Sequence, residues 1–298
     1  MKKFISYLSL LIVAILLTIK AVLYFADGYS DPYYLKVSSP KQSNLILGTS
    51  KSAQGLQPKF FNNVFKKNFY NYSFSINISP YGKTYLNSIK NKLDTTQNNS
   101  IFILSVDVWS ISSITKKPND YLHFRETKSF LKGVNNVTEI PNYNYLINYY
   151  DNKYYSILLK RTPFLLHNDG WLEVFLNDIK TSIDRRTSFT LESYNKKMIK
   201  YKFSSLRLDY LSKTIIFFKK YGKVYIVRLP VHPKLFKIEN KLQPDFNSLI
   251  KPAIEVSNGY FDMTPYNKNY IYTDGVHLNK KSGESVSKTI SNWIKKIQ

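Results

Sequence analysis

The longest apolar run of the chain lies at its N-terminus, over residues 4–25, and Lys20 is the only charged residue within it. Residues 4–19 alone are slightly shorter than the roughly 20 residues that cross a bilayer, but a snorkelling Lys20 lets the helix continue. A signal-peptide cut after position 26 would place bulky Tyr24 at the −3 site. We therefore predict an uncleaved membrane anchor over residues 1–26, in preference to a cleaved signal peptide or a buried helix.

Short apolar runs alternate with helical patterns in the rest of the chain. Residues 27–42 are rich in turn formers and are interpreted as an extended linker. Strands are predicted over 43–50, 69–75, 101–106 and 222–231, and helices after Pro58, over 83–93 and over 282–297. In the last helix Val286, Ile290, Trp293, Ile294 and Ile297 share one face. This alternation indicates an α/β domain whose parallel sheet is covered by helices on both faces.

One segment departs from the alternation. Residues 113–215 are rich in Tyr, Lys and Asn, with aromatic clusters such as NYNYLINYY. We interpret about 113–215 as a mostly helical insertion or lid within a domain that spans residues 43–298.

The formal net charge of +23 raises the question of nucleic-acid binding, but only six of the 43 basic residues are Arg. Bidentate recognition of phosphate or guanine favours Arg, whereas Lys spread along a whole chain is typical of a solvated surface. We therefore expect no nucleic-acid partner. The absence of Cys excludes thiol nucleophiles, disulfides and Cys-zinc sites. No metal-ligand spacing occurs among the four His residues, and no metal or cofactor is expected.

Candidate chemistry follows the first predicted strand and precedes the last predicted helix. Gly48, Thr49 and Ser50 end the first strand, where a serine hydroxyl is exposed and nearby backbone N–H groups can stabilise an oxyanion. Asp274 and His277 lie on one short loop, so both can point into one cleft. Each segment by itself is an ordinary polar turn, and the pair together is more informative.

The two segments read LILGTSKSAQGLQP and YTDGVHLNKKSGESVSKTI, and in order and context they resemble the first and last blocks of the SGNH/GDSL hydrolases. The resemblance covers roughly residues 43–112 and 220–298. It implies a three-layer α/β/α, flavodoxin-like fold, with Ser50 as nucleophile, His277 as base and Asp274 as the carboxylate that orients the base. Ser52 is the alternative nucleophile, two residues further from the strand end.

The remaining family blocks are altered in this chain. Thr49 stands where the family often has Asp, and the loop SINISPYG takes the place of the second block, with Gly82 as one candidate oxyanion donor. The third block usually supplies an Asn to the oxyanion hole, but here the strand ends in Asp107. Since a carboxylate would repel an oxyanion, either Asp107 has another role or the hole uses Asn77 or backbone groups.

His167 and Trp171 lie together in the HNDGW turn of the insertion. They could line a sugar site through stacking on the indole, or form an ordinary surface loop. His232, between two prolines, is interpreted as a loop residue.

Taken with the anchor, the resemblance implies a serine esterase or O-acyltransferase acting on cell-envelope carbohydrate, with a membrane-bound acyl-donor protein as a further partner. Lys2 and Lys3 place the N-terminus in the cytoplasm and the domain outside the cell membrane, which is the periplasm if the cell is Gram-negative. Two alternatives remain. One is a non-catalytic SGNH-fold factor for binding or assembly of envelope polysaccharide, and the other is an anchored basic protein that holds anionic polymer or lipid by charge.

Overall fold

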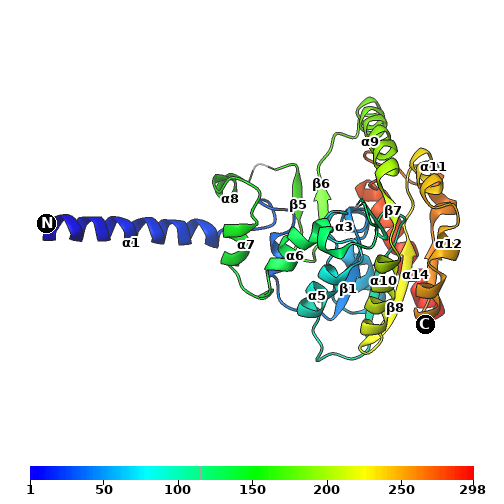
Figure 1. Ribbon diagram of the computed structural model, residues 1–298, viewed down its shortest axis with the longest axis horizontal. Coiled ribbons are helices and arrows are strands. Elements are labelled where there is room, and N and C mark those ends of the chain that lie inside the picture. Colours follow the sequence, from blue (N-terminus) through cyan, green and yellow to red (C-terminus); the bar gives the residue numbers. More distant parts are fainter. Residues whose placement is uncertain (115, 161) are drawn as a thin grey trace.

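The computed structural model describes residues 1–298 except 115 and 161. Helix α1 (Lys2–Tyr24) projects from the folded domain as a single rod and is long and apolar enough to cross a membrane (Figure 1). All of its residues up to Lys20 are exposed. The prediction of one apolar N-terminal helix is confirmed.

A five-stranded sheet forms the centre of the domain. Its strands, in spatial order, are β2 (Phe69–Asn71), β1 (Asn44–Leu47), β3 (Ser100–Ser105), β8 (Gly222–Arg228) and β9 (Tyr260–Asp262). Every neighbouring pair is parallel. If only the five strands of this sheet are numbered along the chain, their spatial order is 2-1-3-4-5, which is common in doubly wound sheets. The predicted parallel α/β sheet is confirmed. The edge strand β9 was not predicted, because three half-buried residues carry no recognisable period.

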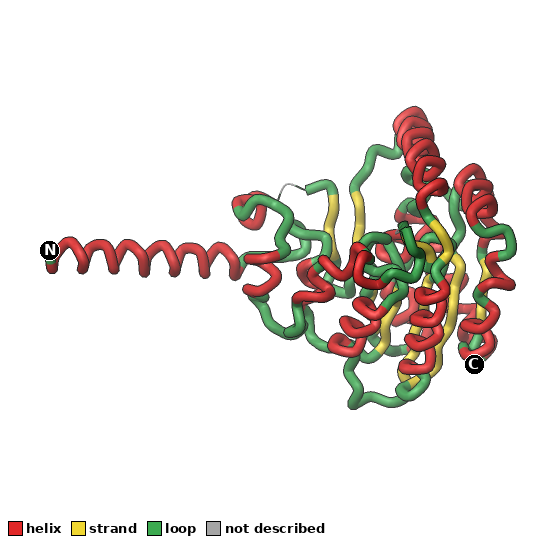
Figure 2. The backbone as a smooth tube through the Cα atoms, viewed as in Figure 1, coloured by secondary structure: helices red, strands yellow, loops and turns green. Residues whose placement is uncertain are grey.

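Helices pack on both faces of this sheet. Figure 2 shows these helices around the strands. Leu45 and Leu47 point to one face and Ile46 to the other, as alternation along a strand requires. The first face is covered by α5 (Lys83–Lys92) and α10 (Ser205–Phe218), and the second by α4 (Pro58–Phe65) and α14 (Lys280–Ile297). In α14, Val286, Ile290 and Ile294 are fully buried, Trp293 is partly buried and Ile297 is 44% exposed.

Residues 27–42 differ from the extended linker expected from their composition. They contain the short helix α2 (Tyr34–Ser38), most of which is buried. Asp31 Oδ1 accepts hydrogen bonds from the backbone N–H groups of Tyr33 and Tyr34, at 2.7 and 2.9 Å, and from the Tyr145 hydroxyl at 2.9 Å. The rings of Tyr33 and Tyr34 pack into the core, so the segment belongs to the domain.

The connection between β3 and β8 holds the insertion. It contains η1 (Tyr121–His123), η2 (Arg125–Lys128), α6 (Phe130–Gly133), α7 (Tyr143–Asn148), α8 (Tyr155–Leu159), the hairpin β5 (Phe164–Leu166) and β6 (Leu172–Val174), α9 (Lys180–Lys200), and the paired strands β4 (Ser112–Ser113) and β7 (Lys202–Phe203). The expected end at residue 215 lies inside α10, which covers the sheet. After β8 come α11 (Pro233–Leu242), α12 (Phe246–Leu249), α13 (Lys251–Val256) and η3 (Thr264–Asn269).

Candidate active site

Ser50 stands beyond the carboxyl end of β1, where the chain turns into α3 (Ser50–Gly55). Gly48 has a φ of +148°, and a Cβ at this position would lie 2.9 Å from the Cβ of Ser105. Glycine is therefore needed for both the backbone conformation and the close approach. The turn leaves the Ser50 side chain partly exposed at the edge where open parallel sheets bind ligands.

The loop before α14 carries Asp274 and His277. Asp274 Oδ1 accepts hydrogen bonds from the backbone N–H groups of Val276 and His277, both at 2.9 Å. Oδ2 of the same carboxylate lies 2.7 Å from His277 Nδ1. Gly275 adopts a φ of +87° between them, which a side chain would disfavour. The loop thus holds the imidazole in one orientation.

The structure brings these two segments together. His277 Nε2 lies 2.9 Å from Ser50 Oγ, although the residues are 227 positions apart in the chain. An ionised carboxylate can only accept hydrogen bonds, so the proton on Nδ1 is donated to Asp274 and the lone pair on Nε2 faces the serine hydroxyl. Such an arrangement lets an imidazole remove the proton of a serine nucleophile.

Asp274 is held in its charged form. Burial alone would raise the pKa of this carboxyl, but the adjacent His277 and the backbone donors lower the pKa to about 2. The carboxylate is therefore ionised throughout the pH range in which imidazole can act as a base.

Ser52, the alternative nucleophile, occupies a different position. Its side chain is fully buried, and its hydroxyl contacts the Leu47 carbonyl oxygen at 3.3 Å and the Ser73 hydroxyl. These contacts join β1 to the loop after β2. Of the two serines, Ser50 is the one that contacts His277.

Asp107, at the end of β3, takes part in a buried charge network beside Ser50. Lys51 Nζ lies 2.9 Å from Asp107 Oδ2 and 2.6 Å from Glu239 Oε1. Trp109 Nε1 donates to the same Glu239 oxygen at 2.9 Å. Burial alone would lower the pKa of Lys51, but the two carboxylates raise it, so the lysine stays charged. Asp107 is thus paired with Lys51 in the structure, and its place beside the oxyanion stays a prediction.

Sequence reasoning missed both Lys51 and Glu239. Lys51 follows Ser50 directly, so its position was a usable signal. Glu239 lies 188 residues away on α11 and has no local signal, because nothing in its helix indicates that the carboxylate is buried.

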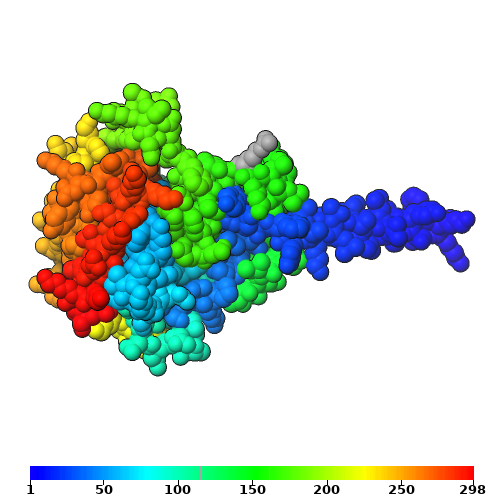
Figure 3. Space-filling model, turned by 180° about the vertical axis from the view of Figure 1, so that it is seen from behind, coloured from blue at the N-terminus to red at the C-terminus, as the bar shows by residue number. Residues whose placement is uncertain are grey.

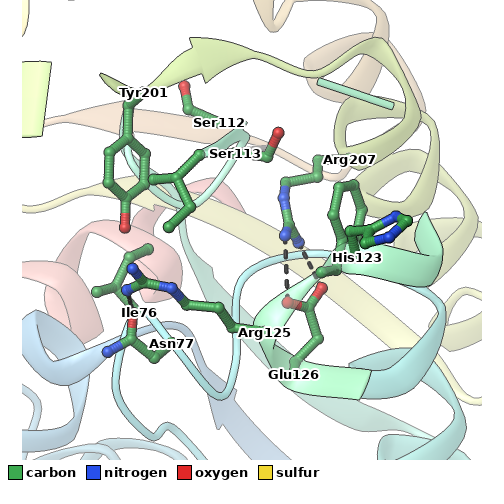
Figure 4. Close-up of a pocket in the computed structure, with 11 residues that line it drawn as sticks. Ile76, Asn77, Ser112, Ser113, His123, Arg125, Glu126, Tyr201 and Arg207 are labelled. Atoms are coloured by element: carbon green, nitrogen blue, oxygen red, sulfur yellow. Dashed lines mark hydrogen bonds and ion pairs between the residues drawn. The ribbon is translucent and has the colours of Figure 1, made fainter. Parts of the chain in front are cut away.

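Asn77 lines a hollow beside the ion pair of Arg207 with Glu126, and Gly82 lies next to the same ion pair. Asn77 Oδ1 accepts a hydrogen bond from Arg125 Nη1 at 2.7 Å, beside Tyr201, and Figure 4 shows this pair next to the buried ion pair of Arg207 with Glu126. A Cβ at Gly82 would meet that same ion pair. Within the described part of the chain, no hydrogen bond joins Asn77 or Gly82 to Ser50.

Helix α9 passes over the loop that carries the candidate base. Arg186 donates from Nε to the Thr273 carbonyl at 2.9 Å and from Nη2 to the Asn177 carbonyl at 2.7 Å. A hollow of about 350 Å³ opens here, lined by Arg185, Arg186, Phe189, Thr190 and Asp274. The insertion therefore forms part of the rim of the candidate site.

Trp171 is not a stacking platform for sugar. Its side chain is 5% exposed, its ring is stacked on His167 at a centroid distance of 4.5 Å, and its Nε1 donates to the Gln54 carbonyl at 2.8 Å. Glu173 bonds His167 Nε2 at 2.9 Å. The HNDGW turn packs the β5–β6 hairpin against α3, and this packing role accounts for the positions of His167 and Trp171.

No protein-family model matches this sequence, and no curated protein matches it either.

Proposed function

We propose that this chain is a membrane-anchored, extracytoplasmic serine esterase or O-acyltransferase of SGNH/GDSL type that acts on acylated cell-envelope carbohydrate. The observation that carries the proposal is the continuous series of contacts from Ser50 Oγ through the imidazole of His277 to the carboxylate of Asp274. The 2-1-3-4-5 strand order and the helices on both faces of the sheet support a three-layer α/β/α arrangement of that family.

In the proposed reaction, His277 Nε2 takes the proton of Ser50 as the serine oxygen attacks the ester carbonyl carbon. The imidazolium, stabilised by Asp274, then gives that proton to the leaving alcohol, and an acyl group remains on Ser50. Water or a sugar hydroxyl next loses its proton to His277 and attacks the acyl carbon. The proton returns to Ser50 and the product leaves, as hydrolysed acid or as transferred ester.

The oxyanion in this scheme is held by backbone groups. The first N–H groups of a helix have no intrahelical partner, and Ser50 and Lys51 begin α3. Lys51 also forms an ion pair with Asp107, so the carboxylate in the third-block position is not an unpaired negative charge. This removes the main chemical objection to an Asp at that position.

The proposed location follows from α1. Lys2 and Lys3 precede its apolar stretch, and the positive-inside rule places them in the cytoplasm. The domain then lies outside, beside envelope polysaccharide and within reach of a membrane-bound acyl donor.

A fluorophosphonate probe tests the proposal directly, because it reacts covalently only with an activated serine. Wild type should be labelled and should hydrolyse nitrophenyl acetate, and Ser50→Ala should abolish both activities. His277→Ala should be about as damaging, since members of a triad act as a unit. Ser52→Ala is the matched control and should retain both.

The result that would overturn the enzymatic proposal is a folded wild type that neither labels nor turns over any ester. A non-catalytic binding or assembly factor for envelope polysaccharide would then fit the site better. Acyl exchange with added envelope glycans separates transfer from hydrolysis once labelling is established.

A further inference from the structure

The last turn of α1 is packed into the folded domain. Leu23 is 4% exposed and Ala26 is 6% exposed, and both belong to the buried cluster that covers one face of the sheet. Because residues 27–42 are folded onto the domain as well, no flexible spacer separates α1 from the domain. The domain therefore begins where the apolar helix ends.

The region around α8 is bound to the chain just after α1. Lys160 Nζ forms an ion pair with Asp27 Oδ2 at 2.8 Å, and Asn152 Nδ2 donates to the Ser30 carbonyl at 2.6 Å. In Figures 1 and 3, seen from opposite sides, this part of the insertion lies at the end of the domain from which α1 leaves. Segments more than a hundred residues apart in sequence thus meet at the exit of α1.

This end of the domain exposes large apolar side chains. Ile147 on α7 is 65% exposed, and Tyr155, Leu158 and Leu159 on α8 are each more than half exposed. We call these four residues the α7–α8 face. The hydroxyl of Tyr154 donates to the Leu146 carbonyl at 2.9 Å and holds the two helices together. Tyr155, Leu158 and Leu159 are spaced i, i+3 and i+4 and therefore share one face of α8. Exposed apolar surface of this kind marks an interaction site, and tyrosine is enriched where membranes meet water.

The length of α1 determines where this face lies relative to the membrane. Its 23 residues extend about 34 Å at 1.5 Å per residue, close to the hydrocarbon thickness of about 30 Å. The end of an inserted α1 thus lies at the membrane–water boundary. We infer that the α7–α8 face lies in the lipid headgroup region of the outer leaflet and, together with α1, fixes the orientation of the domain on the membrane. This inference rests on the proposed insertion of α1.

Site-directed spin labelling tests the inference, because the chain has no Cys and each single-Cys variant carries one label. Leu158→Cys and Leu159→Cys are compared with Ile199→Cys, an aliphatic position on α9 that is also more than half exposed, in full-length protein reconstituted into vesicles of phosphatidylcholine and phosphatidylglycerol. At residues 158 and 159 collisions with oxygen should exceed collisions with a water-soluble nickel chelate severalfold. At residue 199 the order should reverse.

Two outcomes overturn the inference. Equal access of the nickel chelate to the labels at 158 and 199 would place the face in water. Protection from both reagents would indicate a protein partner or a second copy in place of lipid. Retention of the chain in carbonate-washed vesicles separates these outcomes from failure of α1 to insert, which would remove the inference as well. Hydrolysis of nitrophenyl acetate by the same variants reports on Ser50 independently.

Discussion

The charge of Asp274 depends on its neighbours, and this makes a prediction about acid stability. A carboxyl whose pKa falls from 3.8 to about 2 on folding stabilises the folded state above pH 3.8, and this contribution is lost as the pH falls towards 2. The difference corresponds to about 2 kcal/mol. Asp274→Asn should therefore lower the free energy of unfolding near neutral pH, and the deficit should shrink as the pH approaches 2.

Urea unfolding of wild type and Asp274→Asn across this pH range measures the effect. Asp209→Asn, at an exposed carboxylate on α10, should follow wild type closely. A deficit of constant size at every pH would show that the ionisation of Asp274 is not coupled to folding.

Lys51 carries a second prediction at the scale of single residues. Replacing it with Met removes the cation that Asp107 and Glu239 share and leaves Glu239 only the longer contact with Arg228, at 3.9 Å, which should cost about 3–5 kcal/mol of folding free energy. Lys59→Met, at an exposed position on α4, is the matched control and should be nearly neutral. Denaturant unfolding of the two variants measures both changes.

The double variant Lys51→Met with Glu239→Gln sharpens this test. Its loss of folding free energy should be smaller than the sum of the losses of the two single variants, because one of the buried carboxylates that Lys51 neutralised is then gone. Strict additivity would mean that the pair contributes nothing as a pair.

Among the elements, α14 offers a prediction with an internal control. Ile290 is fully buried between the helix and the sheet, and Ile290→Ala should cost about 2–5 kcal/mol. Ile297 extends the same stripe in sequence but is 44% exposed, so Ile297→Ala should cost less than about 0.5 kcal/mol. Equal losses of free energy in urea unfolding would show that the helix packs along its whole length.

For the whole molecule, the prediction concerns topology. Carbonate washing should leave the full-length chain in the membrane pellet, because α1 is long and apolar enough to cross a membrane. Protease added to intact spheroplasts should digest the domain if it lies outside the cytoplasm, and a cytoplasmic marker protein serves as the control. Protection of the domain would reverse the topology and remove the argument for envelope substrates.

The sequence by itself determined the elements whose signals are local. A long apolar run was enough for α1, short apolar runs were enough for the strands β1, β3 and β8, and the helical period of apolar side chains was enough for α14. Both segments of the candidate triad were also visible in the sequence, because a serine at a strand end and an Asp–His turn are each set by neighbouring residues. The order in which the segments occur connected them before any distance was known.

The tertiary structure alone decided which distant groups meet. Glu239 reaches Lys51 across 188 residues, and Asn77 pairs with Arg125 in place of Ser50. Residues 27–42 look like a linker by composition, yet they fold because the insertion supplies Tyr145 and other partners for their buried groups. The physical reason is common to all three. The partner of a buried charge or ring is chosen by how the crossovers bring chain segments together, and that geometry is not encoded in any short window of sequence.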